Sequence, residues 1–340
     1  MLSGNKLPFW FMRQAGRYMA EYRALRSKLQ SSGYSFLDMC YDPEIASEIT
    51  MQPINAFDIP IAIIFSDILT IPDAMGLGVK FIENIGPVLN TIKSKNELSA
   101  IDYTRKDWIF NQVENAIKFT KTKLPKNKHL IGFSGSPFTL ACYIINGGSS
   151  ADGFSSVKEI IKQDIEFVHN IIEILTDLVC EYSAGQIDAG IDAIQFFDSH
   201  AGILNDKDFD DFVITPNKTI VDFVKKRTNI PVICFPRGAG ANYFKFCDAV
   251  SPDIISLDQS IPLDLCFANI DKSIAFQGNL NNELLEKGSI EEILESAKSI
   301  IKECDKNNRK LIFNLSHGII KTTPVENVAA LSRFLIAQNA

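Results

Sequence analysis

The sequence has no long hydrophobic run and no recognisable targeting segment. No apolar stretch reaches the roughly 18–20 residues that cross a bilayer. The first six residues, Met1 to Lys6, lack the apolar core and small-residue cleavage site of a signal peptide. The seven cysteines are scattered without a Cys-x-x-Cys pair, which is typical of reduced, buried thiols. We therefore expect a cytoplasmic protein that does not associate with membranes.

Linkers, low-complexity segments and internal repeats are also absent. Nothing marks a domain boundary, and we expect residues 1–340 to form a single domain. Hydrophobic residues make up 46% of the chain, enough for a large core. The net charge of −7 excludes a generally basic surface and argues against nucleic acid as a partner. If the ligand is anionic, the positive charge must be concentrated in the binding site.

Short apolar runs alternate with longer amphipathic ones along the chain. The short runs predict seven strands, at residues 60–65, 129–134, 193–197, 230–235, 254–257, 273–277 and 310–315. Helices are expected at residues 137–146, 155–187, 206–227, 290–305 and 324–338. This alternation predicts an α/β fold with parallel strands joined by crossover helices.

An open doubly wound sheet and a closed barrel both fit such alternation. No Gly-x-Gly-x-x-Gly motif follows the first predicted strand, so the main mark of a dinucleotide-binding sheet is missing. We therefore predict a single (β/α)8 TIM-type barrel with parallel strands and an N-terminal helical extension. An eighth strand is not obvious in the sequence, and residues 79–92 are interpreted as an inserted hairpin.

Two arginines flank a glycine in an aromatic-rich stretch near the N-terminus, Pro8-Phe-Trp-Phe-Met-Arg-Gln-Ala-Gly-Arg-Tyr18. Arg13 and Arg17 stand four residues apart and would share one face of a helix. The guanidinium fork of arginine matches the two oxygens of a carboxylate. Spacing alone favours a solvated helix face, with Arg17 paired to Glu21. The apolar neighbours, Trp10 among them, instead favour a carboxylate site with apolar walls.

Polar side chains follow five of the predicted strands. They are Asp67, Asp198-Ser199-His200, Arg237, Gln277-Gly278-Asn279 and Ser316-His317-Gly318. The carboxyl ends of barrel strands meet on one face, which is where the active sites of such barrels form. The sequence therefore predicts a functional site at this face.

Several of these residues also have a purely structural interpretation. Asp67 is equally suited to be a helix N-cap, and His317 to be a core histidine bonded to backbone. Tyr143, in the helix after the second predicted strand, would serve equally as a core aromatic. A nucleophilic dyad of Ser199 and His200 is excluded, because adjacent residues of an extended chain point to opposite faces.

Six segments, in order along nearly the whole chain, resemble the uroporphyrinogen decarboxylase family. They are residues 8–18, 132–148, 196–202, 235–240, 277–280 and 316–328. The resemblance implies a homodimer of single (β/α)8 barrels that needs no metal and no organic cofactor. It also implies an activity in haem biosynthesis. The four acetate side chains of uroporphyrinogen III would lose CO2 and become methyl groups, giving coproporphyrinogen III.

The resemblance also implies which residues form the site. The substrate-binding positions are Arg13, Gln14, Ala15, Gly16, Arg17, Asp67, Tyr143, Phe197, Ser199 and His317. Asp67 would face the pyrrole N–H groups, and the two arginines would bind substrate carboxylates. These three residues are the catalytic set that the resemblance implies.

A few positions depart from the usual pattern of the family. They are Gln259, Asn281, Asn282 and Lys321, none of which coincides with a site residue. The leader before Pro8 is also short, so the family's usual N-terminal helix is expected to be shortened.

A corrinoid- or folate-linked methyltransferase on a related barrel is the main alternative. Such enzymes bind zinc through a His-x-Cys pair and a distant cysteine. The corresponding strand here reads Val232-Ile233-Cys234 and lacks that histidine, although His317 stands near the expected third ligand. A tetrapyrrole-binding protein without enzymatic activity is a third hypothesis, and release of CO2 from the substrate would distinguish it.

Overall fold

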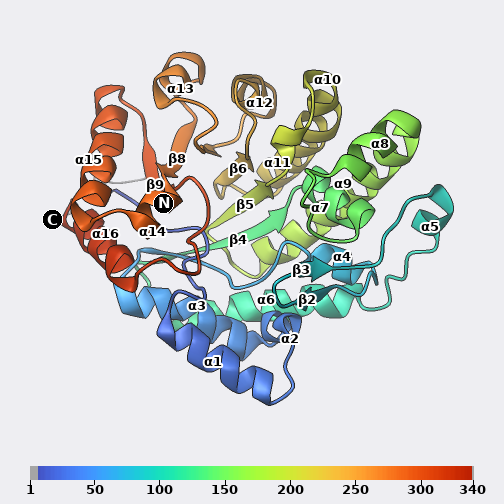
Figure 1. Cartoon of the computed structure of the whole chain (residues 1–340), viewed down its shortest axis with the longest axis horizontal. Coiled ribbons are helices and arrows are strands. Elements are labelled where there is room, and N and C mark those ends of the chain that lie inside the picture. Colours follow the sequence, from blue (N-terminus) through green and yellow to red (C-terminus); the bar gives the residue numbers. More distant parts are fainter. Residues whose placement is uncertain (1–6, 339–340) are drawn as a thin grey trace.

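Seven parallel strands form one curved sheet in the computed structural model, which describes residues 7–338 (Figure 1). In sheet order they are β1 (Ile61–Ile63), β4 (His129–Gly135), β5 (Ala193–Asp198), β6 (Val232–Pro236), β7 (Ile254–Ser256), β8 (Ala275–Leu280) and β9 (Leu311–Leu315). All seven predicted strands are confirmed. In the register of β5 and β6, Phe197 lies opposite Phe235. Because every pair is parallel, the carboxyl ends of all seven strands lie at the same edge.

The N-terminal segment fills the eighth position of the barrel, between β9 and β1. Phe9 forms a single parallel bridge with Phe313 of β9, and the Trp10 backbone N–H donates to the Phe313 carbonyl at 3.2 Å. On the other side, the Gln14 side chain donates to the Ile61 carbonyl of β1 at 3.1 Å. The sequence showed no eighth strand because this closure is a single bridge inside the arginine motif.

Trp10 anchors this segment in the barrel interior. Its side chain is fully buried, and the indole Nε1 donates to Oε1 of Gln277 in β8 at 2.9 Å. Gln277 in turn donates to Oε1 of Gln195 in β5 at 2.9 Å and to Oγ of Ser256 in β7. The N-terminal segment therefore shares one buried polar layer with three strands, and every bond of that layer is strengthened by its low-dielectric surroundings.

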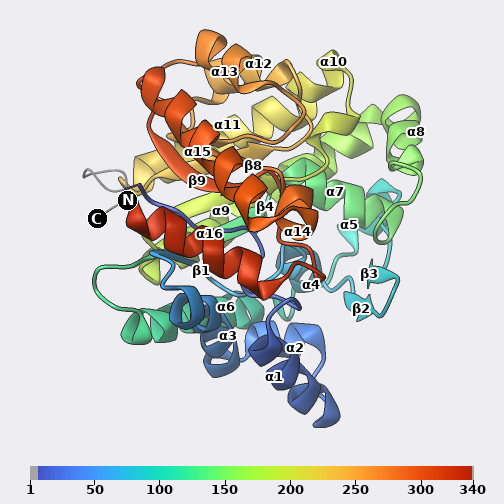
Figure 2. The same ribbon diagram turned by 60° about the vertical axis from the view of Figure 1, so that its left-hand side comes forward.

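Helices precede, connect and follow the strands. The predicted N-terminal extension is confirmed as α1 (Ala20–Ser31), α2 (Phe36–Tyr41) and α3 (Pro43–Phe57), which lie together at the bottom of Figure 2. The remaining helices are α4 (Thr70–Ala74), α5 (Lys95–Ser99), α6 (Lys106–Lys123), α7 (Pro137–Asn146), α8 (Ser155–Gln163), α9 (Ile165–Asp188), α10 (Asp206–Phe209), α11 (Thr215–Arg227), α12 (Asn242–Val250), α13 (Leu263–Asn269), α14 (Asn282–Lys287), α15 (Ile290–Lys306) and α16 (Val325–Ala337). Within residues 7–338, no helix is both long enough and apolar enough to cross a bilayer.

Two details of the predicted helices need correction. The single helix expected over residues 155–187 is two helices, because Asp164 leaves the helical conformation (φ −145°) and its carboxylate accepts the Phe167 N–H at 3.0 Å. A short acidic side chain competes in this way with the hydrogen bonds of a helix interior. The helix expected over 206–227 contains a π-helical turn at Asp210–Ile214.

The inserted hairpin expected at residues 79–92 is confirmed as β2 (Lys80–Ile82) and β3 (Gly86–Val88), which pair antiparallel. Most of the short leader before Pro8 falls in residues 1–6, outside the described residues.

Replacing Trp10 by Ala should destabilise the fold strongly, because it removes a fully buried indole and leaves the Gln277 carbonyl without its donor. We expect a loss of about 3–5 kcal/mol in the free energy of unfolding, measured by urea denaturation. Trp108→Ala is the matched control, since Trp108 is 49% exposed. An equal loss in both variants would show that the N-terminal segment does not hold the barrel together.

Candidate active site

Loops at the carboxyl edge of the sheet bring most of the predicted site residues together. Asp67 follows β1, Ser199 follows β5, and His317 follows β9. Tyr143 lies on α7, the helix that begins directly after β4. The charge of Arg13 contributes to the pKa shifts of Asp67, Tyr143 and His317, so these three side chains lie within electrostatic range of Arg13.

The loop that carries Arg13 and Arg17 is not a helix, so the expectation of a shared helix face is wrong. The Gln14 N–H donates to the Phe11 carbonyl at 2.9 Å and closes a turn in which Arg13 has φ +60°. Helix α1 begins only at Ala20, after a further turn from Gly16 to Met19. An apolar run that pairs with a strand cannot also wind into a helix, and the turns follow from that pairing.

Gln14 holds this loop from within. The residue is buried, its Oε1 accepts the Phe11 N–H at 3.1 Å, and its Nε2 donates to β1. Ala15 and Gly16 are half-buried next to it. Both ends of the Gln14 amide are thus bonded to backbone, and the side chain fixes the position of its two arginine neighbours in the loop.

The Arg13 side chain packs against the backbone of the loop after β9. A Cβ added at Gly318 would lie 2.4 Å from Arg13 Cδ, so only glycine allows this approach. The residue keeps exposed surface, yet its guanidinium lies among protein atoms, and burial is the main cause that lowers its pKa. Asp67 opposes this shift, whereas Arg237 and Arg17 add to it. An arginine starts from so high a pKa that it stays charged at neutral pH.

The helix N-cap expected as one role of Asp67 is not observed, and its carboxylate closes a turn instead. Its Oδ1 accepts the Leu69 N–H at 2.8 Å and so closes the turn before α4, although the N-cap itself is Leu69. Burial raises the pKa of Asp67 to about 6, against the lowering effects of the Leu69 N–H and of Arg13. No ion pair within 4.0 Å joins Asp67 to Arg13 among the ion pairs of residues 7–338. The carboxylate is therefore held near a cation without being neutralised by direct contact.

Two histidines in the site are neutral at pH 7. Burial, followed by the charges of Arg13 and Arg237, lowers the pKa of His317 to about 3. Its Nδ1 accepts the Gly318 N–H at 2.7 Å, which leaves the proton of the neutral ring on Nε2. Burial and Arg237 likewise lower the pKa of His200 to about 4. Neutral imidazoles limit the repulsion between cations in this region.

Tyr143 is half-buried, and its ring centroid lies 5.3 Å from that of His200 and 6.1 Å from that of Phe154. Burial, followed by Asp67, raises the pKa of Tyr143 to about 12, with Arg13 opposing. The phenol therefore keeps its proton at neutral pH and is available as a hydrogen-bond donor.

Phe197 at the end of β5 packs edge-on against Phe133 and Phe235, with ring centroids 5.7 and 6.5 Å away. These rings belong to adjacent strands and give the strand ends an apolar lining. Ser199, two residues on, presents its carbonyl to Arg237 at 3.3 Å.

Arg17 lies at the margin of the site. It is exposed, and the ion pair with Glu21 that a solvated helix face would form does not occur within the described part of the chain. Arg23 Nη1 donates to the carbonyls of Arg17 and Tyr18, at 2.9 and 2.7 Å, and so ties the loop to α1. The charge of Arg17 helps to lower the pKa of Arg13, and Arg17 forms no ion pair within 4.0 Å among residues 7–338.

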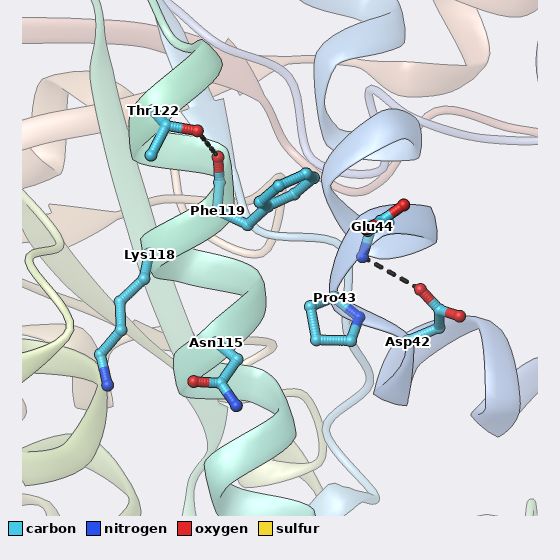
Figure 3. A pocket seen from close by; sticks show the side chains of 7 residues that line it. All are labelled: Asp42, Pro43, Glu44, Asn115, Lys118, Phe119 and Thr122. Carbon is cyan, nitrogen blue, oxygen red and sulfur yellow. Dashed lines mark hydrogen bonds between the residues drawn. The ribbon is translucent and has the colours of Figure 1, made fainter.

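A separate recess lies on the outside of the molecule, between α3 and α6 (Figure 3). Its volume is about 580 Å³, and it is lined by Asp42, Pro43, Glu44, Asn115, Lys118, Phe119 and Thr122. Asp42 is occupied as the N-cap of α3, where its Oδ1 accepts the Glu44 N–H at 3.0 Å. No strand-end residue reaches this recess, so it is not the predicted site.

Comparison with known proteins decides the family. The sequence profile described as "Uroporphyrinogen decarboxylase (URO-D)" matches residues 4–336. The chain belongs to the uroporphyrinogen decarboxylase family. It is 40% identical over 338 residues to the uroporphyrinogen decarboxylase of Neorickettsia sennetsu, with 99% of each chain covered. It is 40% identical over 330 residues to that of Rickettsia bellii, with 96% of this chain and 94% of the relative covered.

Solved structures of other enzymes share the fold. A methyltransferase from Methanosarcina mazei superposes with a TM-score of 0.78 at 17% identity, covering 99% of this chain and 95% of that one. A B12-independent methionine synthase from Shewanella gives 0.59 at 13% identity, covering 87% and 86%. Such distant likeness extends to the TIM-barrel-type fold and not to the chemistry.

The methyltransferase alternative also meets an obstacle in the site. Cys234 is buried in β6, and valine stands two residues before it where the His-x-Cys pair of such a zinc site would have histidine. Among residues 7–338, no three His, Cys, Asp or Glu side chains come together as a metal site would require.

Two charged residues near the strand ends were not among the predicted site residues of the family. Arg237 follows β6, and its charge acts on Arg13, Tyr143, His200 and His317. Asp198 is buried at the end of β5, where it accepts bonds from Thr139 and Asn217 at 2.6 and 3.2 Å. In the sequence, both residues stand directly after a predicted buried strand, and that position pointed to them. The resemblance did not name either of them as a site residue.

His317→Asn should change how stability depends on pH. Unfolded His317 binds a proton below its ordinary pKa of 6.5, whereas the folded ring resists protonation down to about pH 3. Wild type therefore loses stability as pH falls through this window. Asparagine keeps an acceptor near the position of Nδ1 but does not titrate. The difference in free energy of unfolding between wild type and variant, measured with urea, should therefore be smaller at pH 4.5 than at pH 7. A gap independent of pH would contradict the neutral buried imidazole.

Proposed function

We propose that this chain decarboxylates the four acetate side chains of uroporphyrinogen III, giving coproporphyrinogen III and CO2. The observation that carries the proposal is the meeting of Arg13, Asp67, Tyr143 and His317 at the strand ends of a member of this family. A substrate with eight carboxylates requires local positive charge, which Arg13 and Arg17 supply in a chain of net charge −7.

In the proposed mechanism, the pyrrole itself accepts the electrons. Protonation of the ring carbon next to the one that carries the acetate makes the ring a cationic, imine-like acceptor. The bond between the acetate methylene and its carboxylate then breaks, CO2 leaves, and the electron pair neutralises the ring. A second proton converts the resulting exocyclic methylene to a methyl group, while the ring carbon loses the first. No separate electron sink is needed, because the substrate supplies one.

Asp67 is proposed to stabilise the cationic ring. Its carboxylate would face the pyrrole N–H groups, and a negative charge fixed in a low-dielectric site lowers the energy of a developing cation. Burial and the Leu69 hydrogen bond hold this carboxylate in place before the substrate arrives. Because the pKa of Asp67 is about 6, most molecules carry the charge at neutral pH.

Arg13 is proposed to bind a substrate carboxylate within the site, and Arg17 another at its margin. Phe197 would pack against the macrocycle. Tyr143 and neutral His317 would donate hydrogen bonds to it, and Ser199 would complete the contacts. Gln14, Ala15 and Gly16 would hold and line the arginine loop. The fixed positions of these groups would orient one acetate at a time for loss of CO2.

The assembly and the location are part of the same proposal. Residues 7–338 share one hydrophobic core, which supports a single domain. All seven cysteines are free, which supports a reducing compartment such as the cytoplasm. The resemblance implies a homodimer, and the exposed apolar side chains of Ile82 and Ile85 are in keeping with further burial on association.

Anaerobic incubation of the chelator-treated enzyme with uroporphyrinogen III should release CO2 and yield coproporphyrinogen III. The proposed mechanism uses no metal, so added zinc should not raise the rate. Binding without CO2 release would indicate a tetrapyrrole-binding protein without activity. Strict dependence on zinc, with methylation of a thiol, would favour the methyltransferase.

Asp67→Asn should abolish turnover with little effect on substrate binding, because an amide cannot balance a developing cation. We expect kcat to fall about 10²–10³-fold, with KM changed only a few-fold. Wild-type kcat/KM should also decline as pH drops through about 6, where Asp67 takes up a proton.

Asp73→Asn provides the matched control for this variant. Asp73 lies in α4, after the same strand, and is also buried. Its carboxylate accepts a hydrogen bond from Tyr41 Oη at 3.1 Å. This change should lower stability and leave kcat near the wild-type value. A near-normal kcat for Asp67→Asn would contradict the catalytic role of Asp67 and leave it only the structural role of closing a turn.

Sedimentation at working concentration should give twice the chain mass of 37.9 kDa. A monomer under these conditions would refute the homodimer.

A further inference from the structure

Arg237 is a cation without an anion. It follows β6, is half-buried, and forms no ion pair within 4.0 Å in the described part of the chain. Its one hydrogen bond from the side chain goes from Nη1 to the Ser199 carbonyl, at 3.3 Å. A guanidinium carries five N–H donors. The remaining donors of this one have no acceptor among residues 7–338, in a region that already holds Arg13.

Two acidic residues that are bonded to the backbone of Arg237 and of its neighbour Gly238 have carboxylates occupied elsewhere. Asp198, whose backbone carbonyl accepts the Arg237 N–H, directs its own carboxylate to Thr139 and Asn217. Asp258 accepts the N–H of Gly238 at 2.5 Å. The carboxylates of Asp198 and Asp258 therefore bond other groups and leave the Arg237 guanidinium unpaired.

The backbone of Arg237 is fixed on both sides. Its N–H donates to the Asp198 carbonyl at 3.0 Å, and its own carbonyl accepts the Gly202 N–H at 3.1 Å. A Cβ at Gly202 would lie 2.3 Å from the Gly238 carbonyl oxygen, so the loops after β5 and β6 touch backbone to backbone. A rigid base of this kind positions a binding side chain before its ligand arrives.

Arg237 also follows a strand on the opposite side of the barrel from the segment that carries Arg13. The segment that carries Arg13 lies between β9 and β1, and β6 is the fourth position from it in either direction around the sheet. The two cations are nevertheless within electrostatic range of each other, and both lower the pKa of His317. A tetrapyrrole with carboxylates around its rim, seated between them, would meet a guanidinium at opposite edges.

We propose that Arg237 is a third carboxylate-binding arginine, which holds one carboxylate of the tetrapyrrole at the β5–β6 side of the site. The inference rests on the proposed function and assigns a binding role to a residue outside the set that the resemblance implies. The bound group is an acetate or a propionate, both of which present the same carboxylate.

The test compares Arg237→Gln and Arg237→Lys with Arg227→Gln. The control removes the same charge at the end of α11, which leads into the amino end of β6 and so lies at the opposite edge of the sheet. KM and kcat for uroporphyrinogen III are measured anaerobically at several concentrations of KCl. The inhibition constant of coproporphyrinogen III and the thermal unfolding temperature of each variant are measured alongside.

We expect Arg237→Gln to raise KM by about tenfold, the effect of losing a charge-assisted hydrogen bond, with a smaller change in kcat. Its KM should also depend less on KCl than that of wild type or Arg227→Gln, and lysine should restore part of the affinity. Weaker inhibition by coproporphyrinogen III, which keeps only propionates, would identify a propionate as the bound group. Unchanged inhibition would identify an acetate.

The proposal is wrong if KM of Arg237→Gln stays within twofold of the control. It is equally wrong if kcat and the unfolding temperature fall while the salt dependence of KM is that of wild type, because a structural role would give that result. If the wild-type chain does not decarboxylate uroporphyrinogen, the proposed function fails and this role fails with it. Normal wild-type turnover with an unaffected Arg237→Gln removes the Arg237 proposal alone.

Discussion

The pairing of the N-terminal segment with β9 is the constraint on which the rest of the site depends. One parallel bridge at Phe9, the backbone bond of Trp10 to Phe313 and the buried indole close the barrel between β9 and β1. The chain then reaches the carboxyl edge of the sheet at Met12, and Arg13 is the next residue. The segment that completes the barrel is thus also the segment that delivers a cation to the active-site face.

The electrostatics of this face follow from placing cations where few acidic groups oppose them. Arg13 and Arg237 form no ion pair in the described structure, and both histidines are held neutral by burial and by these charges. Asp67 is kept apart from direct contact with either cation and has a pKa of about 6. In such a site the carboxylates of an anionic ligand can pair with the arginines. The Asp67 carboxylate then remains unpaired and can face a developing cation.

The sequence predicted the repeating architecture more fully than the closure of the barrel. All seven strands were legible because parallel strands buried on both faces are continuous apolar runs. The bridged segment was not, since its aromatic run has no alternation and forms one bridge only. The same pairing explains why Arg13 and Arg17 occupy turns although their spacing suits a helix. The break at Asp164 was hidden by helical periodicity that continues on either side of it.

The site residues followed from the resemblance more than from periodicity. The strand ends indicated where the site would form, and Asp67, Ser199 and His317 lie there. Sequence could not show that Gln14 is bonded to backbone at both ends, that His317 is neutral, or that Arg237 lies within electrostatic range of Arg13. Each of these properties depends on contacts between segments far apart in the chain.

A crystal structure with coproporphyrinogen III bound under anaerobic conditions tests the central claim most directly. The account predicts that the tetrapyrrole lies at the carboxyl edge of the strands, with the Asp67 carboxylate about 3 Å from pyrrole nitrogen atoms. A tetrapyrrole bound elsewhere, or one whose pyrrole nitrogens do not face Asp67, would contradict it.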